Sequence, residues 1–129
     1  MPSSSKTTLW EPTGASERPL TLAEVVVRGF YEALSRHNLP DAYAFLTPRF
    51  QAANPFDAWA GGYLNTESVD VETRPGASGN EVAVMIQAVD RYFPDTRETR
   101  RFAGIWRLAP SATAPLGLLL DQATIAPQP

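Results

Sequence analysis

Carboxylates are the main groups with which this sequence could do chemistry, because it contains no cysteine and one histidine, His37. That composition excludes disulfides, thiol nucleophiles and clusters of imidazole ligands. Two aspartates stand out by position. Asp121 follows the apolar run Leu118 to Leu120, and a carboxylate buried in such a run needs a partner. Asp90 ends a long apolar stretch, where we expect it to satisfy the turn that follows.

Arg100 can supply the partner that Asp121 needs. If side chains alternate along its strand, Arg100 shares an inward face with Phe102 and Trp106. The pair could be structural or could bind a ligand, and the sequence leaves both alternatives open. Glu98 shares this face but lies nearer a turn. No loop with the spacing of a calcium site is present, so we expect neither a metal nor a cofactor.

Composition narrows the classes of partner. The 129 residues are 43% hydrophobic and 19% charged, with a net charge of −3. No apolar run approaches the ~20 residues that a membrane-spanning helix needs, so we expect no membrane insertion. The chain also lacks the strongly basic character with which proteins bind phosphate backbones, so we expect no nucleic acid partner.

Helices are predicted for the first half of the fold. Residues 1–20 are rich in small polar residues and proline, which is typical of a flexible lead-in, and Trp10 is their one large aromatic residue. Thr21 and Glu24 have the spacing of a capping box. An apolar stripe at helical spacing follows to about Arg36. We expect His37 in the last turn, where positive charge suits the helix dipole.

Three further helix starts follow within twenty residues. Pro40, Thr47-Pro48 and Asn54-Pro55 each place a proline where a first turn begins, and Gly61-Gly62 marks an end. We interpret Asn54 as the cap of the last of these helices. The pattern predicts short helices bent sharply around another part of the fold.

Strands are predicted from Ser68 onward, where the apolar period changes to two. The expected strands begin at Ser68 and then cover residues 81–90, 97–108 and 116–125. We therefore predict an α+β fold with the N-terminal helices packed in the concave face of a strongly curved antiparallel sheet. The domain is expected to span residues 21–126, with a short tail at 127–129.

The third strand divides into two faces. The inward face carries large apolar residues and one glycine: Phe102, Gly104, Trp106 and Leu108. The glycine is consistent with a sharp bend of the sheet. The outward face alternates charged and apolar residues: Arg101, Ala103, Ile105 and Arg107. Since the second strand is apolar on both faces, we expect the outer sheet face to be covered by a second copy, giving a homodimer.

The order of elements resembles the nuclear transport factor 2-like superfamily, which includes SnoaL-like and ketosteroid-isomerase-like proteins with a cystatin-like α+β cone. The residues that carry the resemblance are 29–34 (GFYEAL), 42–46 (AYAFL) and the F-x-G-x-W-x-L motif at 102–108. The resemblance implies a bent sheet around the first helix and a pocket at the open end. It does not imply one activity, because the superfamily includes several enzyme classes and many binding modules.

Two enzyme classes of this superfamily can be compared by motif position. Ketosteroid isomerases use a tyrosine and an aspartate where this chain has Phe30 and Asn54, so that chemistry is not expected. The resemblance to limonene epoxide hydrolases implies catalytic roles for Asp90, Asp121 and Asn54. The two carboxylates would then act as acid and base. The arginine and tyrosine of that constellation are replaced by alanines, Ala88 and Ala52.

We therefore predict a small-molecule or partner-binding module. A cofactor-independent hydrolase or lyase acting on a small apolar substrate is the alternative, and a domain whose open sheet face docks a protein is a third class. The pocket is expected between the first helix and the sheet, with a small apolar ligand. Its predicted lining residues are Phe30, Leu34, Tyr43, Phe56, Trp59, Tyr63, Val84, Ile86, Arg100 and Trp106.

Overall fold

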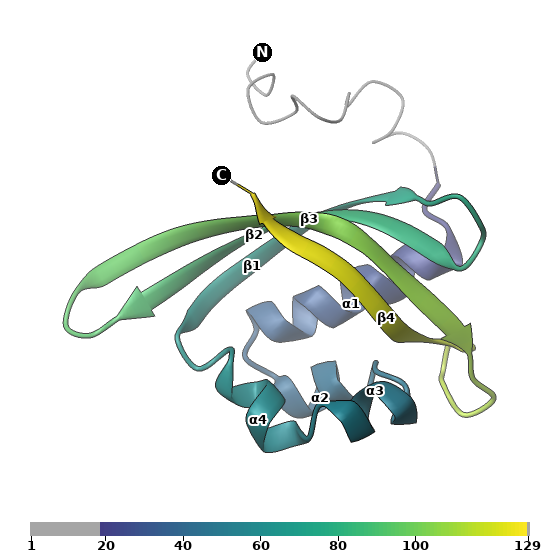
Figure 1. Ribbon diagram of the computed structural model, residues 1–129, viewed down its shortest axis with the longest axis horizontal. Helices are drawn as coiled ribbons and strands as arrows, with labels where there is room; N and C mark the ends of the chain where they lie inside the picture. Colours follow the sequence, from purple (N-terminus) through teal and green to yellow (C-terminus); the bar gives the residue numbers. More distant parts are fainter. Residues whose placement is uncertain (1–18, 129) are drawn as a thin grey trace, which may run out of the picture.

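The computed structural model describes residues 19–128, which form four helices followed by four strands (Figure 1). The helices are α1 (Leu22–Ser35), α2 (Leu39–Tyr43), α3 (Pro48–Ala53) and α4 (Phe56–Gly61). The strands are β1 (Thr66–Pro75), β2 (Glu81–Tyr92), β3 (Thr96–Pro110) and β4 (Leu118–Gln128). Residues 1–18 of the expected lead-in, with Trp10, lie outside the described residues.

The predicted start of α1 is confirmed by its capping box. The Glu24 N–H donates to the Thr21 hydroxyl at 3.1 Å, and the Thr21 N–H donates to the Glu24 carboxylate at 3.0 Å. The predicted position of His37 in the last helical turn is wrong. The helix ends at Ser35, and His37 has a left-handed φ of 63° with its N–H donating to the Leu34 carbonyl. The chain turns away there, as at many helix ends.

The short helices begin at prolines, as predicted. The capping role that the sequence assigns to Asn54 is different in the structure. Thr47 caps α3, and Pro48 lies in its first turn. Asn54 instead ends α3, where its side-chain amide donates to the Phe50 carbonyl at 3.0 Å. The residue that precedes α4 is Pro55, which makes no side-chain cap. The predicted capping role of Asn54 is therefore wrong. The last carbonyls of α3 have no partner within the helix, and the Asn54 side-chain amide donates to one of them.

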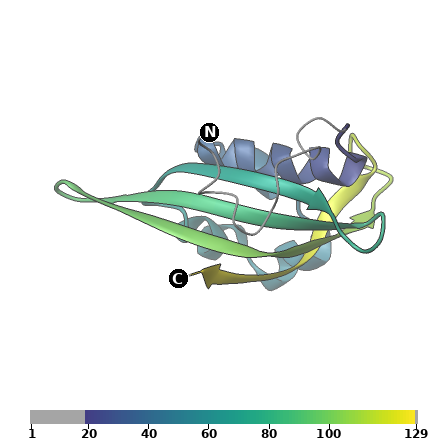
Figure 2. The same ribbon diagram turned by 90° about the horizontal axis from the view of Figure 1, so that it is seen from above.

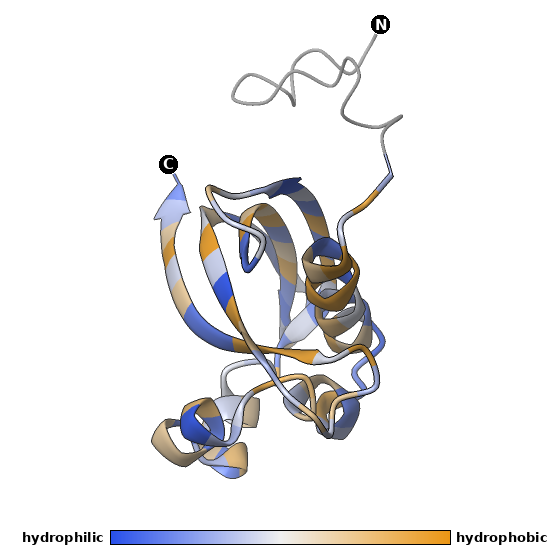
Figure 3. Cartoon of the chain, turned by 90° about the vertical axis from the view of Figure 1, so that its right-hand side faces the viewer, coloured by the Kyte–Doolittle hydropathy of each residue, from blue (hydrophilic) through white to orange (hydrophobic). Residues whose placement is uncertain are grey.

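The four strands form one antiparallel sheet in the order β1-β2-β3-β4. The long β2–β3 hairpin projects beyond the helices in both ribbon views (Figures 1 and 2). Seen from the side, the sheet bends into a C whose hollow side faces the helices (Figure 3). The predicted α+β class, with helices on the concave face of a curved antiparallel sheet, is confirmed. The sheet remains open, and β4 continues to Gln128, beyond the predicted strand end.

The two faces of β3 also follow the prediction. Trp106 and Leu108 are buried on the concave face, whereas Arg101 and Arg107 are exposed on the convex face. Gly104 is required where β3 meets β4, because a Cβ at this position would lie 2.0 Å from the Thr124 carbonyl oxygen. Any larger residue would force the two strands apart at the bend.

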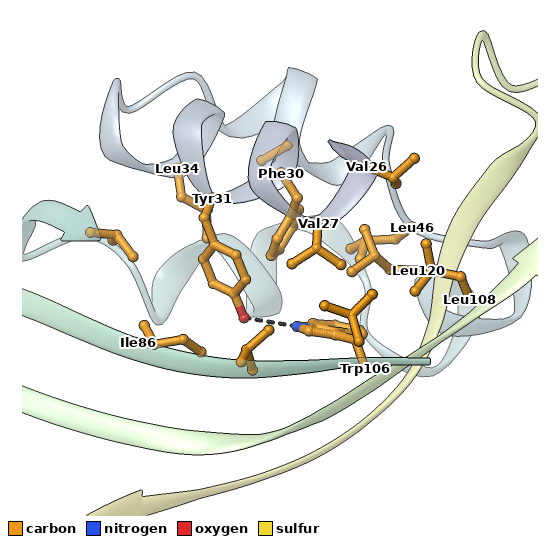
Figure 4. Packing of buried hydrophobic residues seen from close by; sticks show 14 of the residues in the cluster. Val26, Val27, Phe30, Tyr31, Leu34, Leu46, Ile86, Trp106, Leu108 and Leu120 are labelled. Carbon is orange, nitrogen blue, oxygen red and sulfur yellow. Dashed lines mark hydrogen bonds between the residues drawn. The ribbon is translucent and has the colours of Figure 1, made fainter. Parts of the chain in front are cut away.

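The core lies between α1 and the sheet (Figure 4). Its largest fully buried apolar side chains are Phe30, Leu46, Leu120, Val26, Val27, Val82 and Val84. Helix α1 packs mainly against β1 and α2. Within residues 19–128, no helix is long and apolar enough to cross a membrane.

Candidate functional site

Half of the predicted pocket residues belong to the packed core. Phe30, Leu34, Val84, Ile86 and Trp106 are all buried. The Trp106 ring lies 5.8 Å from the Phe30 ring, centroid to centroid, in an edge-to-face arrangement. These residues belong to the packed core between α1 and the sheet. We call the part of this core around Trp106, Phe30 and Tyr31 the closed end, and a ligand could contact only the less buried residues beyond it.

Aromatic side chains of the short helices form a half-buried row next to this core. The Tyr43 ring lies 5.1 Å from both Phe56 and Trp59, and Trp59 lies 5.0 Å from Tyr63. The Tyr43 hydroxyl donates to the Asn54 carbonyl at 2.9 Å, which fixes the junction between α3 and α4. The row is therefore held in place by the backbone of its own helices.

The concave side of β3 and β4 supplies further half-buried apolar residues. Phe102 and Ile125 pack against the core but keep part of their surface exposed. They point to the same side as Trp106, because residues two and four apart share one face of a strand and Gly104 pairs with Ile125. We call Trp59, Tyr63, Phe102 and Ile125, together with Arg100, the wide end of the cone.

Asp90 and Arg100 form the charged part of the wide end. Arg100 Nη2 lies 2.6 Å from Asp90 Oδ2, and the Asp90 side chain is only 2% exposed. The Thr66 hydroxyl donates to Asp90 at 3.1 Å, and the Tyr92 hydroxyl donates at 3.4 Å. The expectation that Asp90 serves the following turn is therefore wrong, since its partners are strand side chains. The Arg100 guanidinium also lies over the Phe102 ring, 5.4 Å from the centroid.

Asp121 has a different partner from the one predicted. It accepts hydrogen bonds from the Thr47 hydroxyl at 2.8 Å and from both Nε and Nη2 of Arg49. These bonds to Arg49 and Thr47 hold the pKa of Asp121 below its ordinary value, although partial burial opposes them. The predicted pairing with Arg100 is wrong. Asp121 instead fastens α3 to β4, next to the Thr47 N–H to Leu120 carbonyl bond of 2.9 Å.

The structure does not bring the three candidate catalytic residues together. Asp90 is opposite Glu98 on β3, whereas Asp121 lies at the irregularity beside Arg107. At about 3.3 Å per residue, these two places on β3 are roughly 30 Å apart along the strand. Carboxylates that share one reacting centre, as in glycoside hydrolysis, lie within about 10 Å. Asn54 is engaged separately in ending α3.

Sequence reasoning overlooked Tyr31. Its hydroxyl accepts a 2.8 Å hydrogen bond from the Trp106 indole N–H between α1 and the sheet (Figure 4). Burial raises the pKa of Tyr31 above its ordinary value, against the effect of that bond. The sequence feature that could have identified Tyr31 is its position beside Phe30 in α1, because the apolar stripe of this helix is wide enough to bury both side chains.

Two surface hollows among the described residues are lined by none of the five residues of the wide end. One lies between α1 and the edge strand β1, where Leu20 and Val25 are half-exposed. The other lies between the start of β1 and the turn that joins β2 to β3, next to His37 and Phe93. Among residues 19–128, no three histidine, aspartate or glutamate side chains gather as a metal ion would require.

Comparison with known proteins finds likenesses in structure and none in sequence. No family model matches the sequence, and no curated protein matches it significantly. RV0760c from Mycobacterium tuberculosis, in complex with estradiol-17beta-hemisuccinate, superimposes with a TM-score of 0.59 at 14% identity, over 79% of this chain and 91% of that chain. A computationally designed 17-OHP binder gives a TM-score of 0.56 at 14% identity, over 84% of this chain and 100% of that chain.

The VirB8 protein of Agrobacterium tumefaciens also has a similar structure. Its TM-score is 0.54 at 11% identity, over 87% of this chain and 97% of that chain. Each of the three likenesses covers at least 79% of this chain and at least 91% of the other. The chain therefore has the same fold as these three proteins, and this is the cone-shaped fold that the resemblance in the sequence implied.

Proposed function

We propose that this domain is a binding module for a small apolar molecule, which lies at the wide end of the cone. The observation that carries the proposal is the incomplete cover of the concave face. Trp106 is 4% exposed, whereas Phe102 and Ile125, on the same face, keep part of their surface exposed. Apolar surface on a concave face, with a few polar groups beside it, is typical of ligand sites.

The structural neighbours support the same proposal. RV0760c is described in complex with an estradiol derivative, and the designed protein is described as a 17-OHP binder. Both proteins share the fold of this chain, with TM-scores of 0.59 and 0.56. From these proteins we take only the general property of binding a small ligand, and the place of the ligand in this chain is argued from its own concave face.

The alternative, a cofactor-independent hydrolase or lyase with pocket carboxylates, has less support. Acid–base catalysis needs both groups within hydrogen-bond reach of the reacting atoms. Asp90 is engaged by Arg100 at one end of β3, and Asp121 is engaged by Arg49 at the other. A binding role needs no such convergence.

Titration with N-phenyl-1-naphthylamine, a neutral apolar dye that fluoresces when bound, tests the proposal. We expect the dye to bind and Trp59→Ala to weaken binding by about tenfold, since a buried aromatic contact typically contributes more than 1 kcal/mol. Trp10→Ala, outside the described residues, is the matched control and should change the dissociation constant by less than about twofold. Absence of dye binding, or equal effects of the two substitutions, would overturn the proposed site.

A further inference from the structure

Arg100 is held in one position at the wide end by two neighbours. Its Nη2 lies 2.6 Å from Asp90, and its guanidinium lies over the Phe102 ring. Asp90 is in turn fixed by the hydroxyls of Thr66 and Tyr92. A guanidinium that is fixed in this way loses little further side-chain entropy when it binds another group.

The same guanidinium still has donors available to a ligand. The ion pair joins its Nη2 to Asp90, and the Arg100 side chain is 45% exposed. An arginine carries five N–H donors in a planar fork that matches the geometry of a carboxylate. Because Arg100 lies next to Phe102, a ligand that packs on this ring meets the guanidinium at its outer end.

We propose that the apolar ligand of the wide end carries an anionic oxygen group, a carboxylate or sulfonate, and that Arg100 binds this group. The inference rests on the proposed function and names the chemical class of its ligand. Asp90 is the positioning residue, because it is buried and contacts Arg100.

The nearby negative charges do not remove this preference. Glu98 is opposite Asp90 on β3 and is exposed, so water and salt screen its repulsion of an anion. The Arg100 donors act in direct contact, where charge-assisted hydrogen bonds are about twice as strong as neutral ones. The field of Asp90 and Glu98 is evident at Tyr92, whose pKa is raised first by desolvation and then by these two carboxylates.

A pair of dyes that differ in one sulfonate isolates the contribution of the anion. The dyes are 8-anilinonaphthalene-1-sulfonate and its neutral counterpart N-phenyl-1-naphthylamine. The measured quantity is the ratio of their two association constants at low ionic strength. We expect Arg100→Gln to lower this ratio at least fivefold. Arg101→Gln, whose side chain is exposed on the convex face, is the matched control and should leave the ratio within twofold.

Two further variants separate ligand binding from folding. Arg100→Gln leaves a buried carboxylate without its cation, which can destabilise the fold. The double variant Asp90→Asn/Arg100→Gln removes both charges and should show the same fall in the ratio. Asp90→Asn alone removes the negative charge that lies 2.6 Å from the guanidinium but leaves an amide oxygen that can still accept from it, so Arg100 keeps a partner and the ratio should rise.

The outcomes distinguish this inference from the proposed function. Binding of both dyes with an unchanged ratio in the single and double Arg100 variants would overturn the inference and leave the proposed function standing. Binding of neither dye to the unsubstituted protein would overturn both.

Discussion

The closed end and the wide end of the cone are built from the same strand face, yet one is core and the other is surface. Trp106 and Phe102 are four residues apart on β3 and point to the same side. Trp106 is covered by Phe30, Tyr31 and Phe50, whereas Phe102 remains partly exposed beside Arg100. The comparison shows that alternation places both rings on the concave face, and that helix cover alone decides which ring is core.

Replacing the aromatic ring at the closed end should have the largest effect. Trp106→Ala is expected to lower the free energy of unfolding by about 3–5 kcal/mol, because it leaves a cavity among rigid neighbours. It also leaves the Tyr31 hydroxyl without its hydrogen bond. Chemical denaturation measures this loss.

Phe102→Ala at the wide end is the matched control for that comparison. We expect it to cost about 1 kcal/mol, since part of the ring already contacts water, while it weakens dye binding. Equal losses for the two variants, or a loss below about 1 kcal/mol for Trp106→Ala, would contradict the division into closed and wide ends.

Tyr31→Phe tests whether the closed end also depends on its polar contact. The substitution keeps the ring but removes the acceptor of the buried Trp106 N–H. An unsatisfied buried donor costs about 1–3 kcal/mol, so we expect a loss of about 2 kcal/mol in urea denaturation. Tyr43→Phe removes a hydroxyl that donates to two backbone carbonyls at the half-buried row and is expected to cost less. The reverse order would argue against a tightly closed end.

The convex face of β3, opposite Trp106 and Phe102, also carries apolar side chains. We propose that Ala103 and Ile105, with Arg101 and Arg107 at the rim, pair with a second copy of the chain. Ile105 is 38% exposed, and the centre of an interface is typically apolar with a polar rim.

A charge placed in this patch should weaken self-association. We expect Ile105→Arg to raise the dimer dissociation constant at least about tenfold, or about 1.4 kcal/mol. Ala53→Arg adds the same charge to an exposed position on α3 and should have no such effect. Sedimentation velocity measures both, and a monomeric unsubstituted protein at micromolar concentration would exclude the dimer.

The sequence predicted the parts of this fold that depend on local rules. The capping box at Thr21, the proline starts and the alternation along β3 each follow from a few neighbouring residues. Charge pairing could not be predicted, because it depends on which distant strands and helices meet. Arg100 was therefore assigned to Asp121 although it pairs with Asp90, and Asp121 received its partner from α3. The extent of the closed core, including Tyr31, likewise depends on how far α1 covers the sheet.

The two aspartates provide the last and smallest test, because each belongs to one end of the cone. Asp121 fastens α3 to β4 near the closed end through Thr47 and Arg49. Asp121→Asn should cost about 1 kcal/mol near pH 7, the range expected for a hydrogen-bonded and partly exposed ion pair. The pKa of Asp121 is lowered in the folded protein, so the folded state binds a proton less readily than the unfolded chain does.

The stabilisation by Asp121 is therefore complete above the unfolded pKa of about 3.9, and it is lost as pH falls through the lower folded value. We expect urea denaturation to show a difference between the protein and its Asp121→Asn variant at pH 7 that shrinks below about pH 4. Arg36→Ala breaks a surface pair with Glu32, whose two side chains are both largely exposed, and should cost less at pH 7. A difference that stays constant between pH 7 and pH 3 would mean that Asp121 contributes through packing alone, and that its charge does not hold α3 against β4.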